Sequence, residues 1–205
     1  NGFVGSLQRF GDRYCCMDKI VMWLKIAVSC LPAMLIGLPL NDWLDKHFYN
    51  PTVVALMLLL YGAGFLFVER YNRSRKPRVN SIAALRWSDA LLIGVFQVLA
   101  LIPGTSRSGA TILGGILIGT SREVAAEYTF FLAVPVMFGA SLLKIVKFGA
   151  ISGTELGVLL VGMAVAFGVS ILAIRFLMGY IRKHDFTAFG WYRIGLGLLV
   201  LLYFY

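Results

Sequence analysis

The feature that most constrains this chain is a series of long apolar stretches without a single charged residue. A helix needs roughly 20 consecutive apolar residues to cross the ~30 Å hydrocarbon core of a bilayer. Uncharged stretches that reach or approach this length occupy residues 26–41, 48–68, 90–106, 108–121, 128–143, 156–174 and 194–205. Because 59% of the residues are hydrophobic and the mean hydropathy is +0.81, we predict an all-α polytopic membrane protein with a single integral membrane domain over residues 1–205.

The order of elements follows from where charges and turn residues interrupt these stretches. The predicted transmembrane helices lie near residues 20–40, 52–69, 126–147, 155–178 and 188–205. A loop or interfacial helix at 1–19 precedes the first of them, and a turn-rich connection at 41–51 leads to the second. A basic loop follows at 70–87, and the last three transmembrane helices lie within 121–205.

The net charge of +9 is distributed as a topology signal and forms no nucleic-acid-binding stripe. Lys and Arg concentrate on the cytoplasmic side of membrane proteins. Lys46, Lys144 and Lys147 would lie outside, whereas the basic residues at or near cytoplasmic ends would be those at 9, 13, 19, 25, 70, 73, 75, 76, 78, 86, 122, 175, 182 and 183. We therefore expect loop 70–87 in the cytoplasm and no nucleic acid as a partner.

Residues 88–120 differ from the other apolar segments because a polar break divides them. Ile-Pro-Gly-Thr-Ser-Arg-Ser-Gly at 102–109 separates two arms, 88–102 and 108–120. At 1.5 Å per residue each arm would be ~18 to 22 Å long, too short to cross but long enough to pass the midplane. This pattern predicts a re-entrant helical hairpin whose two ends both stay in the cytoplasm.

The hairpin and the three helices after it would make a plausible repeat unit. An odd number of crossings lets a second copy insert upside down, as in inverted-repeat membrane proteins. Residues 1–69, with two transmembrane helices, would then be the end of the first repeat. We expect that an N-terminal region containing one further helix and a partner hairpin precedes Asn1, and that the two hairpin tips meet inside the bilayer.

Arg107 is the one charged residue between Asp89 and Arg122. Holding an arginine deep in a membrane costs ~2.5 to 3.5 kcal/mol even on the lenient insertion scale, so such a residue usually has a ligand or partner. The structural alternative is an arginine that reaches an interface or pairs with a buried carboxylate. The helix break around Arg107 favours the ligand.

The chemistry of the break favours an anion. Pro103 and Gly104 end the first arm, and the second arm begins near Ser106, so its unpaired N–H groups and partial positive charge face the break. A guanidinium, hydroxyl groups and glycine for close backbone approach would together suit a phosphate. The candidate residues are Gly104, Thr105, Ser106, Arg107, Ser108, Gly109 and Thr111.

Other polar residues give weaker signals. Gln97 lies in an apolar arm and either bonds a neighbouring helix or points toward the site, and Glu127 poses the same choice or marks a cytoplasmic end. His47 and His184 are expected in interfacial loops. The glycines at 62, 64, 114, 115 and 119 are expected to permit close helix packing. No Cys/His group has the spacing of a zinc site, and no nucleophile and base are paired, so the residues alone predict only a buried phosphate site.

The stretch FQVLALIPGTSRSGAT at 96–111 resembles the signature P-G-x-S-R-S-x-x-T of bacterial undecaprenyl pyrophosphate phosphatases, the bacitracin-resistance protein family. Similarity continues through 121–127 and 131–135, and the order of transmembrane helices fits over essentially the whole chain. The resemblance implies hydrolysis of undecaprenyl diphosphate to the monophosphate carrier lipid of cell-wall synthesis. It also implies a divalent cation, Mg²⁺ or Ca²⁺, a bacterial plasma membrane, and a site that faces the outer side.

The same resemblance suggests roles for individual residues. Arg107 and Ser106 would act in catalysis, with Arg107 clamping the diphosphate. The remaining motif residues Gly104, Thr105, Ser108, Gly109 and Thr111 would bind or position the diphosphate, and Gln97 would line the site. The family's other signature, a glutamate-rich hairpin with a Ser and a His, is expected N-terminal to this chain, and the nucleophile or base and the main metal ligands would belong there.

Two alternatives from other functional classes remain at this stage. Broken helices and inverted repeats also build the anion sites of transporters, so a lipid-phosphate transporter or flippase would explain the same break. A noncatalytic membrane scaffold would require that Arg107 and the serines only pack. Under the phosphatase interpretation the partners are a polyprenyl diphosphate lipid and membrane lipids, and a homodimer is possible.

Overall fold

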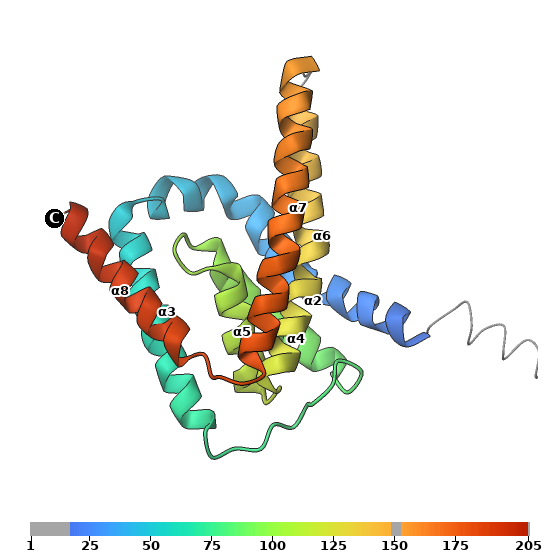
Figure 1. Cartoon of the computed structure of the whole chain (residues 1–205), viewed down its shortest axis with the longest axis vertical. Coiled ribbons are helices and arrows are strands. Elements are labelled where there is room, and N and C mark those ends of the chain that lie inside the picture. The colour runs from blue at the N-terminus through green and yellow to red at the C-terminus, as the bar shows by residue number, and fades with distance from the viewer. Residues whose placement is uncertain (1–16, 149–152, 205) are drawn as a thin grey trace, which may run out of the picture.

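The computed structural model describes residues 17–148 and 153–204, whose regular elements are all helices and whose longest connection covers residues 73–86 (Figure 1). The helices are α2 (Met17–Phe48), α3 (Pro51–Asn72), α4 (Trp87–Val98), the 3₁₀ helix η1 (Leu99–Leu101), α5 (Arg107–Ile118), α6 (Arg122–Phe148), α7 (Gly153–Ile181) and α8 (Thr187–Phe204). Helices α2, α3, α6, α7 and α8 are long and apolar enough to cross a membrane. The predicted all-α polytopic class is confirmed. The predicted N-terminal loop or interfacial helix lies, up to residue 16, outside the described residues.

Helix α2 is longer than the sequence predicted, and the connection at 41–51 is correspondingly wrong. The helix continues to Phe48, and only Tyr49 and Asn50 separate it from α3. The Asn50 side chain accepts a hydrogen bond from the N–H of Val53 at 2.9 Å, and Pro51 takes the first helical position, where it needs no N–H. Pro32 and Pro39 lie inside α2; each removes a backbone hydrogen bond, and the helix runs as an arc (Figure 1).

Helices α3 and α8 lie side by side and make the most extensive helix–helix contact among the described residues (Figure 1). Glycines allow their backbones to approach. A Cβ atom on Gly62 would lie 2.9 Å from the Gly190 carbonyl oxygen, and one on Gly197 would lie 3.1 Å from the Ala55 carbonyl oxygen. Such contacts between small residues drive helix association where no water is present. The predicted packing role of Gly62 is confirmed.

Residues 87–118 form the predicted pair of short apolar helices with a break between them. A Cβ atom on Gly114 of α5 would lie 2.4 Å from the Phe96 ring of α4, so the two arms pack closely. Helix α4 also packs on α2, because Gly94 lies directly against the backbone of Ser29. The Ser29 hydroxyl donates to the Ala90 carbonyl at 2.6 Å and lies 2.7 Å from the Tyr128 hydroxyl of α6. These contacts fix the hairpin against α2 and α6.

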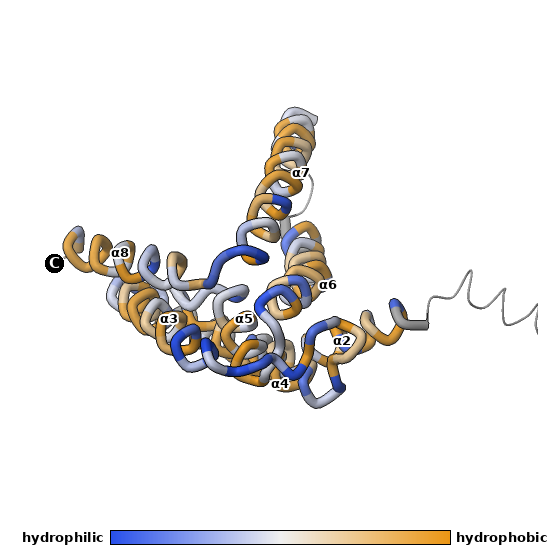
Figure 2. Tube along the Cα trace, turned by 60° about the horizontal axis from the view of Figure 1, so that its bottom comes forward, coloured by the Kyte–Doolittle hydropathy of each residue, from blue (hydrophilic) through white to orange (hydrophobic). Residues whose placement is uncertain are grey.

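Two hydrophobic clusters form the interior, one around α3, α5 and the α7–α8 connection, the other between α2, α4 and α6. Helix α7 has no buried residue over its most apolar stretch. It stands apart from the other helices over most of its length (Figure 2). Exposed apolar side chains on a helix of this length suit contact with lipid. The inverted repeat stays a prediction.

Hydrophilic segments gather where α3 ends, α6 begins and α7 ends (Figure 2). The buried Glu69 carboxylate accepts hydrogen bonds from the Arg122 Nε at 2.9 and 3.0 Å, from a second Arg122 nitrogen, and from the backbone N–H of Phe186 at 3.1 Å. Glu69 therefore joins α3, α6 and the α7–α8 connection. Arg78 pairs with Asp89 at 2.7 Å at the start of α4. All these connections lie on one face, which agrees with the predicted cytoplasmic grouping.

Candidate anion-binding site

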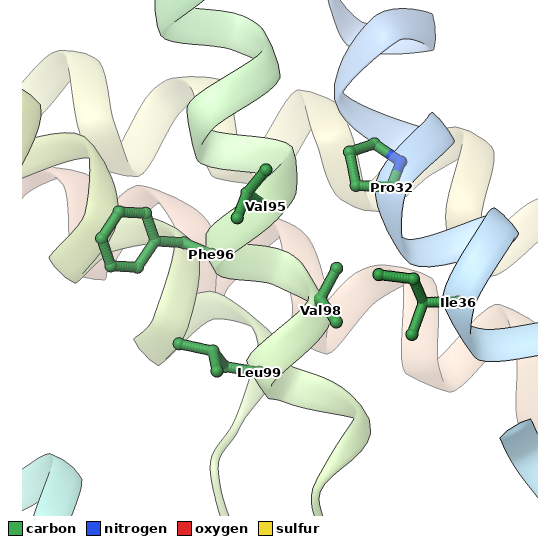
Figure 3. A pocket seen from close by; sticks show the side chains of 6 residues that line it. All are labelled: Pro32, Ile36, Val95, Phe96, Val98 and Leu99. Atoms are coloured by element: carbon green, nitrogen blue, oxygen red, sulfur yellow. The ribbon is translucent and has the colours of Figure 1, made fainter.

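A groove in the described part of the chain is apolar and separate from the polar break. An open groove of about 250 Å³ lies between α2 and α4, and Figure 3 shows the side chains that line it: Pro32, Ile36, Val95, Phe96, Val98 and Leu99. All six are apolar, so the groove can bind hydrocarbon but offers nothing to a phosphate. The predicted phosphate site lies at the break between α4 and α5, which carries the polar groups.

Gly104 sets the position of the break. Its φ angle is +90°, and a Cβ atom there would lie 2.6 Å from the carbonyl oxygen of Val54. Only glycine allows both the turn and this close approach. Val54 lies in the first turn of α3, whereas Glu69 lies near its end, and fifteen residues of helix between them correspond to ~22 Å. The tip of the hairpin therefore reaches the end of α3 opposite the ion pairs.

Ser106 caps helix α5 from a strained backbone conformation. Its φ of 64° is the one positive value at a non-glycine position among the described residues. Its Oγ accepts a hydrogen bond from the N–H of Gly109 at 3.3 Å and lies 3.2 Å from the Ser108 Oγ. A conformation of this kind costs roughly 1 to 3 kcal/mol and persists where the surrounding structure enforces it, often at functional sites.

Arg107 occupies the first position of α5, directly after this cap. The N–H groups of Arg107 and Ser108 belong to the first turn, where a helix offers no internal acceptor, and the partial positive charge of the helix adds to the guanidinium. Arg107 is half-buried and lies within electrostatic range of the Cys30 thiol of α2. In residues 17–148 and 153–204 no carboxylate pairs with Arg107, which favours the ligand over the structural alternative.

The other predicted residues are divided between the tip and its support. Thr105 and Gln97 are buried, and the Thr105 hydroxyl and both polar atoms of the Gln97 amide have no hydrogen-bond partner in the described part of the chain. The Thr111 hydroxyl is engaged: it donates to the Arg107 carbonyl at 3.0 Å and accepts from Thr129 of α6 at 3.0 Å. Thr111 therefore ties the first turn of α5 to α6 and is not open toward a ligand. Whether these residues bind substrate stays a prediction.

Arg193 is the residue that the sequence analysis missed. It projects from α8, and its Nη1 donates to the Thr105 carbonyl at 3.0 Å. A Cβ atom on Gly109 would lie 3.2 Å from its Nη2, so the guanidinium lies directly beside α5 and would have to shift for a larger residue. Arg193 shares a helix face with Gly190 and Gly197 at i, i+3 and i+7, the face that packs on α3. That spacing was the available signal.

In the described part of the chain, the hydrogen bonds and ring contacts of the two histidines are local and include no residue of the break. His47 lies in the last turn of α2 and stacks on Trp43, and His184 follows α7 and stacks on Tyr180. His47 is in the last helical turn and not in a loop, whereas His184 lies in the predicted connection. The described residues around the tip thus supply cationic and hydrogen-bonding groups and no evident general base.

The described residues do not provide a set of ligands for a divalent cation. Among the described residues no three His, Cys, Asp or Glu side chains are placed to hold a metal ion. The buried carboxylates Glu69 and Asp89 are engaged in ion pairs near the end of α3 and the start of α4. Guanidinium and hydroxyl groups do not replace carboxylates as ligands of Mg²⁺ or Ca²⁺, so the residues at the tip do not by themselves fit a bound divalent cation.

The described chain is a polytopic helical membrane protein with a broken hairpin, and an arginine and a helix N-terminus lie at the break. The chain belongs to the family described as Bacitracin resistance protein BacA, whose sequence profile matches residues 2–199. This range includes the whole break. The predicted resemblance is confirmed.

Curated relatives agree with this assignment. The chain is 60% identical over 188 residues to the undecaprenyl-diphosphatase of Acetivibrio thermocellus, and this alignment covers 91% of this chain and 69% of the relative. It is 58% identical over 189 residues to that of Desulfitobacterium hafniense, covering 91% and 68%. It is 55% identical over 196 residues to undecaprenyl-diphosphatase 1 of Clostridium acetobutylicum, covering 95% and 72%.

Proposed function

We infer that this protein is an undecaprenyl-diphosphatase, a membrane hydrolase that removes the terminal phosphate of undecaprenyl diphosphate and yields undecaprenyl phosphate. The observation that carries this function is the identity of 55 to 60% over most of the chain to enzymes of that name. The family match includes the break with Arg107. Membrane helices suit a substrate that is itself a membrane lipid.

The first turn of α5 is proposed to hold the terminal phosphate. Its N–H groups, the Ser108 hydroxyl and the Arg107 guanidinium would donate hydrogen bonds to phosphate oxygens. The planar guanidinium can bind two of these oxygens at once. Charge spreads over these oxygens as the phosphoryl group transfers, so donors fixed in advance lower the barrier. Arg107 and Ser106 are the proposed catalytic residues of this chain, because Ser106 fixes the turn that carries the donors.

The remaining predicted residues would support this arrangement. Gly104 and Gly109 permit the close approaches of the tip, and Thr111 holds the first turn against α6. Gln97 and Thr105 offer buried polar atoms that a bound diphosphate or its water could satisfy. These roles are proposals, as is the requirement for Mg²⁺ or Ca²⁺.

The cellular setting is also proposed. The protein would lie in the bacterial plasma membrane, with the tip open to the outer side, because the tip reaches the end of α3 that is remote from the basic loops. The product would re-enter the carrier-lipid cycle of cell-wall synthesis, and resistance to bacitracin would follow from the family. A homodimer stays a prediction. The relatives' names give no support to the transporter or flippase alternative.

Phosphate release from a polyprenyl diphosphate tests this function. The full-length protein in detergent or liposomes should release inorganic phosphate in the presence of Mg²⁺ and lose the activity in EDTA. Arg107→Ala should lower kcat/KM at least about a hundredfold, as expected for loss of a donor to the transferring group. Equal release by the wild type and Arg107→Ala would contradict the proposed role of the break.

A further inference from the structure

We propose that Arg193 forms a second phosphate subsite, which holds the inner phosphate of the lipid diphosphate while the first turn of α5 holds the terminal one. This inference rests on the proposed function. It assigns to α8, a helix outside the hairpin motif, a direct share in recognising a diphosphate.

The two arginines flank the same helical turn. Arg107 is the first residue of α5, and Gly109, beside which the Arg193 guanidinium lies, is the third. Two residues of helix correspond to a rotation of about 200°, so positions one and three face opposite ways. Arg107 lies toward Cys30 of α2, and Arg193 approaches from α8. A diphosphate at the end of α5 would thus have a guanidinium on each side.

Arg193 has hydrogen-bond donors that the described residues do not use. A guanidinium carries five N–H donors, and in the described part of the chain one hydrogen bond of Arg193 is seen, from Nη1 to the Thr105 carbonyl. Its other neighbours are aromatic: the Phe65 ring centroid is 5.9 Å from the guanidinium carbon, and the Tyr61 phenol is within electrostatic range. No described carboxylate forms an ion pair with it.

The position of the Arg193 guanidinium favours the binding of an anion. A charged side chain within a membrane protein interior is costly unless a partner of opposite charge is present. Arg193 is half-buried on the face of α8 that packs on α3, and glycines at 62 and 190 hold it there by letting the helices meet. A phosphate next to Gly109 would supply the missing negative charge.

Thr105 supplies an independent sign of a ligand at this point. Its side chain is fully buried, and its hydroxyl has no hydrogen-bond partner among the described residues. A buried hydroxyl without a partner costs roughly 1 to 3 kcal/mol. The same residue presents its carbonyl to Arg193, so a phosphate held by Arg193 would lie beside the residue whose hydroxyl lacks an acceptor.

The competing role for Arg193 is a purely structural brace of the loop through the Thr105 carbonyl. A glutamine can keep one N–H donor for that carbonyl but removes the charge and the fork. A lysine keeps the charge without the fork. Arg193→Gln and Arg193→Lys therefore separate the two roles, and Arg175→Gln on the exposed surface of α7 is the matched loss of an arginine.

The test measures both binding and turnover in the full-length protein. Affinity for inorganic pyrophosphate and for inorganic phosphate is measured for the wild type and each variant, together with KM and kcat for a polyprenyl diphosphate and the thermal unfolding temperature in detergent. The subsite predicts that Arg193→Gln weakens pyrophosphate binding at least tenfold more than phosphate binding. It also predicts a KM at least tenfold higher with a smaller change in kcat, partial recovery in Arg193→Lys, and no change in Arg175→Gln.

Equal loss of pyrophosphate and phosphate binding in Arg193→Gln, or wild-type KM and pyrophosphate affinity in both Arg193 variants, would overturn the subsite. If Arg193→Gln unfolds, Arg193→Lys decides between the two roles. If Arg193 only braces the loop, Arg193→Lys should prefer pyrophosphate over phosphate as strongly as the wild type does. Failure of the proposed function is distinct, because it would appear as absent phosphate release in the wild type itself.

Discussion

Ser106 shows how the site depends on a single backbone angle. Its φ of 64° would suit glycine better, yet the serine hydroxyl accepts the hydrogen bond that caps α5 and lies next to Ser108. A serine here accepts backbone strain and supplies a cap for α5 and a hydroxyl at the proposed phosphate site.

Replacing Ser106 by alanine should therefore be worse than replacing it by glycine. Both variants lose the hydroxyl, but only glycine relaxes the positive φ, so Ser106→Gly should exceed Ser106→Ala in stability by about 1 kcal/mol. Both should have lower kcat than the wild type. Unfolding in detergent and phosphate release measure the two effects, and an alanine variant as stable as the glycine variant would show that Ser106 is not strained.

Gly104→Ala should displace the tip. The added Cβ would meet the Val54 carbonyl oxygen at 2.6 Å in a backbone conformation that alanine rarely adopts, so we expect a loss of about 1 to 3 kcal/mol of stability and at least a tenfold fall in kcat/KM. Gly139→Ala is the control, because nothing lies within 4 Å of its Cβ position. Equal effects of the two substitutions would contradict the contact with α3.

The sequence predicted the residues of the break and missed Arg193 for a physical reason. Arg107 stands alone between two apolar arms, and proline and glycine mark the break directly. Arg193 lies six residues after the start of α8 and follows Trp191 and Tyr192. An arginine next to such aromatic residues is typical of a membrane interface, so the sequence did not mark it as a site residue. The state of Thr111 was also beyond prediction, because its bond to Thr129 joins residues of different helices.

At the scale of elements, α3 and α8 place Arg193. Gly62→Ala should separate them, since its Cβ would lie 2.7 Å from the Ile194 side chain and 2.9 Å from the Gly190 carbonyl oxygen. We expect a lower unfolding temperature and a higher KM than in the wild type, because α8 carries Arg193. Gly195→Ala on another face of α8 has open space and should leave both unchanged. A Gly62→Ala variant that is destabilised but has an unaltered KM would show that the contact between α3 and α8 does not position Arg193 for substrate binding.

The elements themselves were largely predictable from the period and length of apolar segments. The five long helices and the two short arms lie where charges and turn residues place them. The main error, at 41–48, arose because polar and charged residues such as Asp42 and Asp45 were taken to end a helix that in fact continues to Phe48. Polar residues beyond a bilayer's edge do not stop a helix; the Asn50–Pro51 cap does.

At the scale of the whole molecule, charge predicts orientation. Tyr49 and Arg73, at the two ends of α3, are both exposed and should lie on opposite sides of the membrane. In a variant without Cys15, Cys16 and Cys30, a membrane-impermeant thiol reagent added outside intact cells should label Tyr49→Cys and not Arg73→Cys. Labelling of Arg73→Cys from outside would reverse the orientation and place the tip of the hairpin toward the cytoplasm.

The central claim is that the whole molecule hydrolyses a lipid diphosphate at the break between α4 and α5. Phosphorus NMR of polyprenyl diphosphate in proteoliposomes containing the full-length protein tests it most directly, because the signal identifies the products. We predict conversion to lipid monophosphate and inorganic phosphate in equal amounts, strongly slowed in Arg107→Ala. A lipid diphosphate that stays intact, or that only moves between leaflets, would contradict the claim.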